Sequence, residues 1–149
     1  MTRGIVVGVD GSEGSKRALE WAAGEARLRA VPLEVVLVWL PSVLIYAGAG
    51  WSAADNDTFE GLLESARERL ERTCESVAPM LDGLEVKRTV VEGTAARALM
   101  DAAVDADLLV VGTRGHGGFA GLLLGSVSAQ CAHHSPCPVV IVPHHEKTG

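Results

Sequence analysis

The chain lacks any lysine- or arginine-rich block and has only three cysteines. Its 13 basic residues are outnumbered by 19 acidic ones, which gives a formal net charge of −6. Because a polyphosphate backbone is held by many positive charges, this balance argues against DNA or RNA as a partner. Cys74, Cys131 and Cys137 are an odd number at unrelated spacings, so they predict no disulfide framework and fit a reducing cytoplasm.

Charge is also missing from residues 115–145, where no Asp, Glu, Lys or Arg occurs. A membrane-spanning helix needs about 20 predominantly apolar residues, but glycines, serines and prolines such as Pro136 and Pro138 interrupt this stretch. Residues 1–12 carry one positive charge and an apolar run broken by Asp10, a pattern unlike that of a signal peptide. We therefore expect one globular domain over residues 1–149, in the cytoplasm and without a membrane partner.

Apolar runs alternate with helical patterns along the chain. Runs of Val, Ile and Leu predict strands at 4–10, 33–40, 84–91, 107–112 and 138–142, the third with the polar alternation of a strand nearer a sheet edge. Apolar residues three and four apart predict a helix from the N-cap Ser12 to before Pro32, and helices over about 58–78, 94–103 and 126–133. This order predicts an α/β fold with a doubly wound, open five-stranded parallel sheet in the strand order 3-2-1-4-5.

The carboxyl ends of the first and fourth strands are the expected binding site, because open α/β sheets bind ligands where the winding reverses. Asp10, Gly11 and Ser12 follow the first strand, and a glycine cluster that begins at Gly112 follows the fourth. In the expected strand order these two turns are neighbours.

The glycine cluster and the helix after it offer the groups that an anion needs. Gly112 and Gly115 allow a tight, left-handed backbone close to a ligand. Gly125 and Ser126 lie where a helix begins, so its free N–H groups and the hydroxyls of Ser126 and Ser128 can meet a phosphate. The alternative is a glycine-rich turn that serves packing alone.

Other phosphate-binding motifs are absent from the sequence or incomplete. It has no G-x-x-x-x-G-K-[ST], so a Walker-type loop is excluded. Gly115, Gly117 and Ala120 fit the degenerate G-x-G-x-x-A, but no acidic residue follows about twenty positions later at a strand end. A receiver-type phosphoacceptor would need acids and a lysine at strand ends that finish here in Val91 and Val142.

The spacing Gly112-x2-Gly115-x9-Gly125-Ser126 resembles the motif of universal stress proteins of the nucleotide-binding branch. The resemblance covers nearly the whole chain, from the opening strand to the closing segment His133-His134-Ser135-Pro136-Cys137-Pro138. It implies an adenine-nucleotide α-hydrolase-like fold with flavodoxin-like topology. It also implies a stress-response module that binds ATP, with or without Mg²⁺.

The resemblance further implies a homodimer formed through the last strand, Val139 to Val142. An apolar strand at a sheet edge must be covered or paired, so the strand itself also favours pairing. Coverage by residues 143–149 is the alternative.

Carried over by position, the resemblance implies a nucleotide site made of Gly8, Val9, Asp10, Val38, Val111, Gly112, Thr113, Arg114, Gly115, Gly125, Ser126, Val127 and Ser128. Asp10 would meet ribose hydroxyls or metal-linked phosphate, with a turn role that caps Ser12 as the alternative. Val38 would line the adenine pocket, unless the strand register puts Trp39 there. Arg114 would pair with the phosphates or lie solvated in its loop.

Alternatives to a nucleotide-binding regulatory module stay open. A slow Mg²⁺-dependent ATP hydrolase would use Asp10, although the sequence offers little besides Asp10 and Arg114 to orient water and clamp charge. A sensor of cyclic AMP or another adenine nucleotide would use the same site. Flavin binding would need a hydroxyl-rich phosphate loop that the first turn lacks. The five histidines, with Cys131 and Cys137, lack the ligand spacing of structural zinc, so no metal site is expected there.

Overall fold

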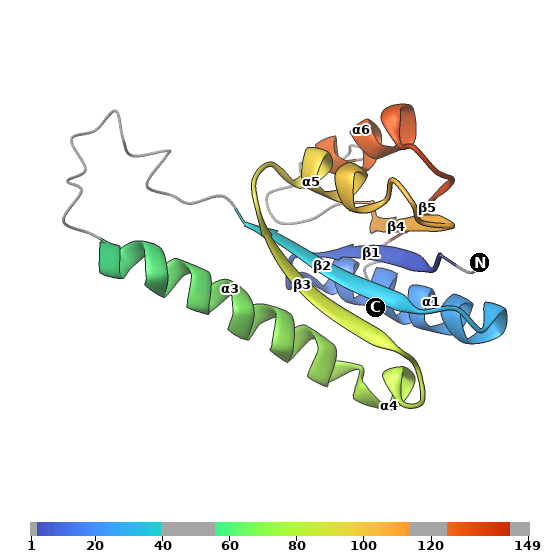
Figure 1. Ribbon diagram of the computed structural model, residues 1–149, viewed down its shortest axis with the longest axis horizontal. Coiled ribbons are helices and arrows are strands. Elements are labelled where there is room, and N and C mark those ends of the chain that lie inside the picture. The colour runs from blue at the N-terminus through green and yellow to red at the C-terminus, as the bar shows by residue number, and fades with distance from the viewer. Residues whose placement is uncertain (1–2, 40–55, 114–124, 144–149) are drawn as a thin grey trace, which may run out of the picture.

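The computed structural model describes residues 3–39, 56–113 and 125–143, whose strands form one parallel sheet (Figure 1). The strand order is β3-β2-β1-β4-β5, so the predicted fold class and order are confirmed. The strands are β1 (Ile5–Val9), β2 (Leu33–Trp39), β3 (Val86–Glu92), β4 (Leu108–Gly112) and β5 (Val139–Val142). Because β1 pairs in parallel with β4, the turns that follow these two strands leave the same edge of the sheet.

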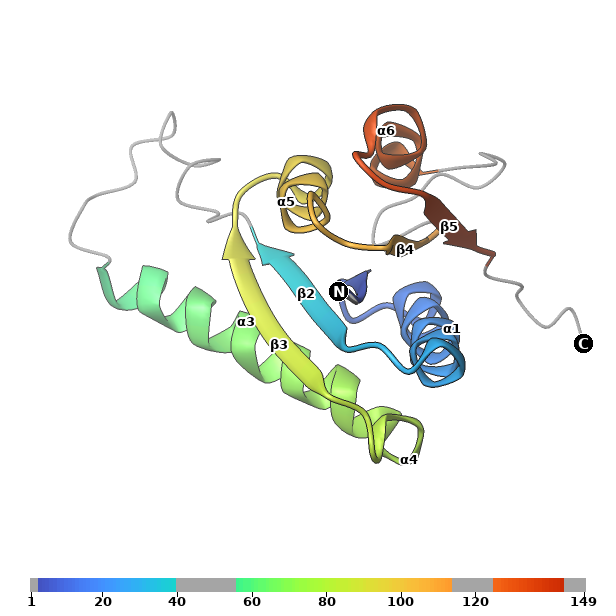
Figure 2. The same cartoon turned by 45° about the vertical axis from the view of Figure 1, so that its right-hand side comes forward.

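Helices cover both faces of this sheet (Figures 1 and 2). One face carries α1 (Glu13–Arg29) and α3 (Asn56–Ser76), and the other carries α5 (Ala95–Ala102) and α6 (Ser126–His134). The helix predicted over about 58–78 ends earlier, because Pro79 cannot continue it and lies in the first turn of the short α4 (Ala78–Leu81). None of the helices in the described segments is long and apolar enough to cross a membrane.

Successive side chains of the central strands point to opposite faces of the sheet and contribute to two hydrophobic cores. Val7 of β1 packs toward α1 and α3, whereas the preceding Val6 packs toward α5 and α6. In β4, Val110 belongs to the first core and Leu109 to the second. Burial on both faces explains why these strands are nearly continuous apolar runs in the sequence.

Both ends of α1 are capped. The Ser12 side chain accepts a hydrogen bond from a backbone N–H of the first turn at 3.2 Å, which confirms Ser12 as the N-cap. At the other end Ala30 adopts a left-handed conformation with φ 55°, two residues before Pro32. The buried face of α1 is built largely of small residues, which allow close packing on the sheet: Ala18, Ala22, Ala23 and Ala26.

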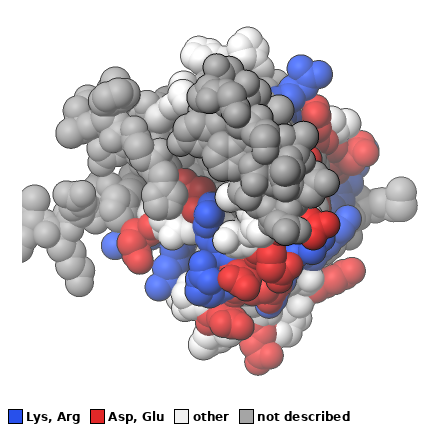
Figure 3. All heavy atoms as spheres, turned by 90° about the vertical axis from the view of Figure 1, so that its left-hand side faces the viewer, with Lys and Arg blue, Asp and Glu red and all other residues white. Residues whose placement is uncertain are grey.

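Charges of both signs cover the outer surface of α3. Arg67 lies 3.6 Å from Glu64, and Arg72 lies 3.9 Å from Glu68. Figure 3 shows the described basic and acidic side chains intermingled on one face of the molecule. Exposed pairs of this kind contribute little to stability, so α3 is held mainly by its buried apolar residues Ala66, Leu70 and Cys74, and Val77 continues this stripe just after the helix.

The two edge strands of the sheet differ in character. β3 carries the exposed residues Lys87, Arg88 and Glu92, and Arg88 forms an ion pair with Glu71 of α3. This confirms the prediction of an edge strand from its polar alternation. β5 forms the opposite edge, and its four residues are all apolar and half-buried.

The cysteines divide between core and surface. Cys74 of α3 and Cys131 of α6 are fully buried, one in each core, where they pack as small hydrophobic residues. Burial raises the pKa of both thiols, because a thiolate loses its solvation there; at Cys74, Arg88 opposes this effect and Glu71 adds to it. Cys137 is half-buried, with its Sγ 3.5 Å from the Pro138 carbonyl oxygen.

We expect Leu19→Ala to lower the free energy of unfolding by about 2–5 kcal/mol. Leu19 is fully buried between α1 and the sheet, so its truncation leaves a cavity. Leu28, on the same helix, is 84% exposed, and Leu28→Ala is expected to change stability by less than about 0.5 kcal/mol. Urea unfolding followed by circular dichroism measures both. Equal losses in the two variants would contradict this assignment of the buried face.

We expect Cys137 to react first with a chromogenic disulfide reagent at pH 8. The reactive form is an accessible thiolate, and the raised pKa and burial of Cys74 and Cys131 keep those two thiols protonated and shielded. The native protein is expected to show one fast thiol, and Cys137→Ser removes that phase. A fast phase of unchanged amplitude in Cys137→Ser would show that a core cysteine is accessible.

Candidate functional site

A pocket of about 100 Å³ opens where β1 and β4 end. It lies on the face of the sheet covered by α5 and α6. Its walls include these residues of the predicted nucleotide site: Gly8, Val9, Asp10, Val38, Val111, Gly112 and Val127. Sequence reasoning misses four further lining residues: Ser15, Val36, Ala95 and Leu99. The fold thus brings residues from both turns and from β2, α5 and α6 to one pocket.

Gly8 makes room for the floor of the pocket. A Cβ atom at this position would lie 2.6 Å from Cδ1 of Leu99, much closer than two carbon atoms approach. Leu99, on α5, is 4% exposed and rests on the backbone of β1. A glycine inside a strand is a sequence signal for such an approach. The signal does not identify the distant side chain that fills the space.

Asp10 both shapes the first turn and lines the pocket. Its Oδ1 accepts the Ser12 N–H at 2.9 Å, and its own N–H donates to Ser15 Oγ at 3.2 Å. Gly11, between Asp10 and Ser12, has φ 88°, a backbone conformation that residues with a side chain rarely adopt. The turn role considered for Asp10 is therefore confirmed, and the pocket-lining position is compatible with it.

Gly112 serves a different purpose from the one predicted. Gly112 does not adopt the left-handed backbone that a glycine allows, because the described glycines with positive φ are others: Gly4, Gly11, Gly83 and Gly93. A Cβ atom at Gly112 would instead lie 3.0 Å from the carbonyl oxygen of Gly14. The glycine therefore lets the end of β4 approach the first turn of α1. Gly115 lies outside the described residues, as does Arg114.

Backbone and side-chain hydrogen bonds join the start of α6 to the end of β4. The N–H of the N-cap Gly125 donates to the Thr113 carbonyl at 2.5 Å. Ser128 is 2% exposed, and its Oγ donates to the carbonyl oxygens of Thr113 (2.9 Å) and Gly125 (3.1 Å). Ser126, the first residue of α6, is exposed. Of the two hydroxyls considered for an anion, Ser128 is thus engaged inside the fold and Ser126 is accessible.

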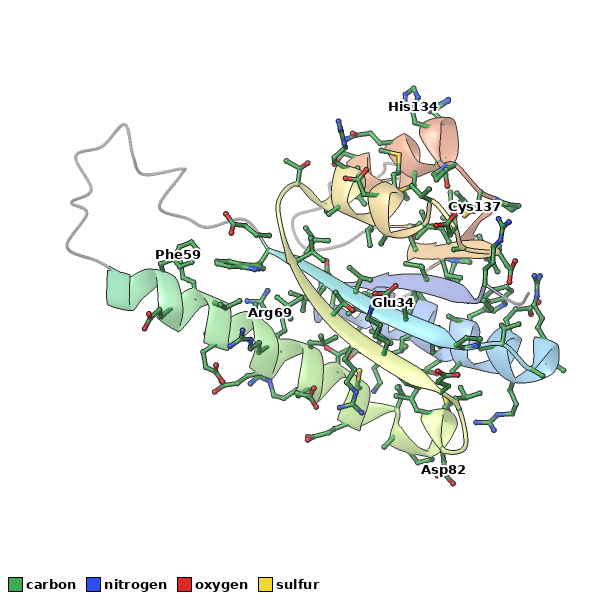
Figure 4. All side chains as sticks on the ribbon, viewed as in Figure 1. Glu34, Phe59, Arg69, Asp82, His134 and Cys137 are labelled. Atoms are coloured by element: carbon green, nitrogen blue, oxygen red, sulfur yellow. The ribbon has the colours of Figure 1, made fainter. Side chains whose placement is uncertain are left out.

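The side chains of Val38 and Trp39 point to opposite faces of the sheet, because successive residues of a strand alternate in direction. Val38 lines the pocket, whereas Trp39 points to the opposite face and packs against the first core. Its ring lies 5.3 Å, centroid to centroid, from that of Phe59, which Figure 4 shows near the start of α3. The alternative in which Trp39 lines the pocket is therefore wrong, and Val38 holds that position.

Aliphatic side chains form most of the pocket wall, and Asp10 is the one charged residue among the described residues that line it. Val36, Leu99 and Val111 are all buried, so this wall is rigid as well as apolar. Such a wall suits a flat ring of low polarity, with the backbone groups at the strand ends available to orient it.

Within residues 3–39, 56–113 and 125–143, no three His, Cys, Asp or Glu side chains come together as metal ligands. The rings of His133 and His134 lie 6.1 Å apart at the end of α6, and Figure 4 shows His134 at the outer side of that helix. His116, His144 and His145 lie outside the described residues. The described histidines therefore add no metal site to the pocket at β1 and β4.

Comparison with known proteins agrees with this geometry. Residues 1–143 match the model of the universal stress protein family. A universal stress protein of Mycolicibacterium smegmatis is 37% identical over 142 residues, which cover 93% of this chain and 47% of that protein. The chain thus spans about half the length of the curated relatives it matches.

Two related structures hold adenine nucleotides. A universal stress protein in complex with cAMP is 32% identical, with a TM-score of 0.59 over 94% of this chain and 95% of that one. The Archaeoglobus fulgidus universal stress protein in complex with dAMP is 27% identical, with a TM-score of 0.65 over 93% and 96%. The family model matches residues 1–143, which are most of the chain, and the chain therefore belongs to the universal stress protein family.

Proposed function

We propose that the protein binds an adenine nucleotide in the pocket where β1 and β4 end. The observation that carries the proposal is an aliphatic pocket at the point where the winding of the sheet reverses. The cAMP and dAMP complexes of relatives that are 32% and 27% identical support an adenine nucleotide as the ligand class.

The base is the part of the nucleotide that the pocket suits best. Its volume of about 100 Å³ is well below the roughly 300 Å³ or more of pockets that enclose a drug-sized ligand, so it takes a ring rather than a whole nucleotide. Val38 and Val127 supply apolar walls, and Leu99 supplies the floor. The sugar and phosphates then extend toward the two turns.

The ribose and phosphates are assigned to the turns after β1 and β4. Gly8, Val9 and Asp10 face the ribose, and Asp10 can also hold a metal-linked phosphate. The exposed Ser126 hydroxyl and the N–H groups at the start of α6 bind phosphate, because a helix N-terminus attracts anions. The remaining predicted contacts complete this end of the site: Val111, Gly112, Thr113, Arg114, Gly115 and Gly125.

The proposed role is that of a cytoplasmic stress-response module whose nucleotide-bound state is the signal. ATP, with or without Mg²⁺, is the expected ligand. A homodimer through β5 belongs to the same proposal, because Val139–Val142 present an apolar edge with β4 on one side only among the described strands.

Calorimetric titration with ATP, ADP, AMP and cyclic AMP tests the proposal. We expect saturable binding of at least one of these nucleotides and competition by the others for the same site. Release of inorganic phosphate from ATP, measured in the same samples, separates binding from turnover. Absence of heat and of any shift in Tm with all four nucleotides would contradict the proposal.

The placement of the base predicts that Val127→Phe lowers the affinity for ATP, ADP and cyclic AMP by at least about tenfold, which corresponds to 1.4 kcal/mol of binding free energy. The larger ring fills a pocket of about 100 Å³ that Val127 lines. Ala132 is exposed on the same helix, so Ala132→Phe adds a similar ring away from the pocket and is the matched control. If Val127→Phe folds and binds as tightly as Ala132→Phe, the base lies elsewhere.

The placement of the phosphates predicts that Ser126→Ala weakens the binding free energy of ATP by about 1.5–3 kcal/mol, the range for a hydrogen bond to a charged group. Adenosine has no phosphate, so its affinity is expected to stay unchanged. Calorimetric titration of both ligands with the variant and the wild type measures the difference. An equal loss for ATP and adenosine would place Ser126 at the base or the sugar instead.

A further inference from the structure

Three polar side chains are buried in the described parts of the chain, and two of them flank the pocket. Ser15 is 5% exposed, Thr73 is 8% exposed and Ser128 is 2% exposed. Ser15 is the third residue of α1, and Ser128 is the third residue of α6. Two of the helices that start beside the pocket, α1 and α6, therefore each carry a buried serine at the same position of their first turn.

Ser15 ties together the turn after β1. Its Oγ accepts the Asp10 N–H at 3.2 Å and donates to the Ser12 carbonyl oxygen at 3.0 Å. The Ser15 N–H in turn donates to Ser12 Oγ at 3.2 Å. The hydroxyl thus connects the last residue before the turn to the helix cap, and it fixes the backbone from which the Asp10 carboxylate extends.

Ser128 ties together the two ends of the connection between β4 and α6. Its Oγ donates to the carbonyl oxygens of Thr113 and Gly125, which lie on the two sides of that connection. The Gly125 N–H donates to the same Thr113 carbonyl. The serine hydroxyl therefore sets the position of the α6 N-terminus relative to the end of β4.

The two serine-held turns are in contact through Gly112. A Cβ atom at Gly112 would lie 3.0 Å from the Gly14 carbonyl oxygen and 3.6 Å from the Ser15 backbone nitrogen. The end of β4 therefore rests directly on the first turn of α1. Gly112 and Ser15 both line the pocket, so this contact forms part of its wall.

We propose that Ser15 and Ser128 are positioning residues of the nucleotide site, which hold the two turns in the binding conformation before the ligand arrives. This rests on the proposed function. A site whose backbone is already ordered loses less conformational freedom on binding, so it binds more tightly than a loose one. Neither hydroxyl needs to touch the nucleotide for this effect.

Thr73 provides the matched control for loss of a buried hydroxyl. Its Oγ1 donates to the Arg69 carbonyl at 2.8 Å within α3, and it lines no part of the pocket. Thr73→Ala, Ser15→Ala and Ser128→Ala each remove one buried hydroxyl that donates to a backbone carbonyl. A purely structural role would make the three variants alike in every measurement.

The experiment compares ATP affinity and urea stability across these three variants, and adds amide hydrogen exchange of the nucleotide-free proteins by NMR. We expect similar losses of stability in all three, and ATP binding weakened about tenfold in the two serine variants only. We also expect faster exchange of the Asp10 amide in Ser15→Ala and of the Gly125 amide in Ser128→Ala. Thr73→Ala is expected to leave both amides at their wild-type rates.

The proposal would be overturned if Ser15→Ala and Ser128→Ala both bound ATP as tightly as Thr73→Ala does. If the wild type binds no adenine nucleotide, the proposed function fails, and the exchange rates alone decide whether the serines hold the turns. Unchanged rates at Asp10 and Gly125 would then overturn the positioning role as well. Ser128→Thr keeps the hydroxyl, so recovery of wild-type Gly125 exchange in this variant would support the assignment.

Discussion

The close contact between the end of β4 and the first turn of α1 determines the geometry of the carboxyl edge of the sheet. It depends on the missing side chain of Gly112, because a Cβ atom there would lie only 3.0 Å from the Gly14 carbonyl oxygen. Parallel pairing of β1 with β4 brings the two turns to the same edge, and this contact sets their spacing. The pocket lies beside this contact, since Gly112 and Ser15 both line it.

Each layer of the fold adds a different component to this edge. Strand alternation directs Val36 and Val38 into the pocket and Trp39 toward α3. The first turns of α1 and α6 bring backbone N–H groups and two buried serines. The glycine in β1 admits Leu99 as a floor. A pocket with aliphatic walls and a polar rim results, although no single motif contains all of its residues.

Local patterns were sufficient to predict the strands and their order, because these rest on apolar runs, caps and short crossovers. Most of the pocket positions were instead implied by the resemblance to universal stress proteins, which the spaced glycine motif carries. Contacts between distant segments were not predictable in this way. Leu99 fills the space beside Gly8, and Gly112 meets α1 rather than adopting positive φ, for reasons that only the packed structure contains. The inward direction of the Ser128 hydroxyl also depends on a carbonyl fifteen residues earlier in the chain.

The unequal edges of the sheet limit how copies of this chain can assemble. The charged residues Lys87, Arg88 and Glu92 make β3 a poor template for another strand, whereas β5 is apolar along its length. Edge pairing that uses β5 alone joins two copies head to head and leaves only the charged edges outermost. In the homodimer proposed above, growth through the sheet would then stop at a closed pair, because the outermost edges carry charge.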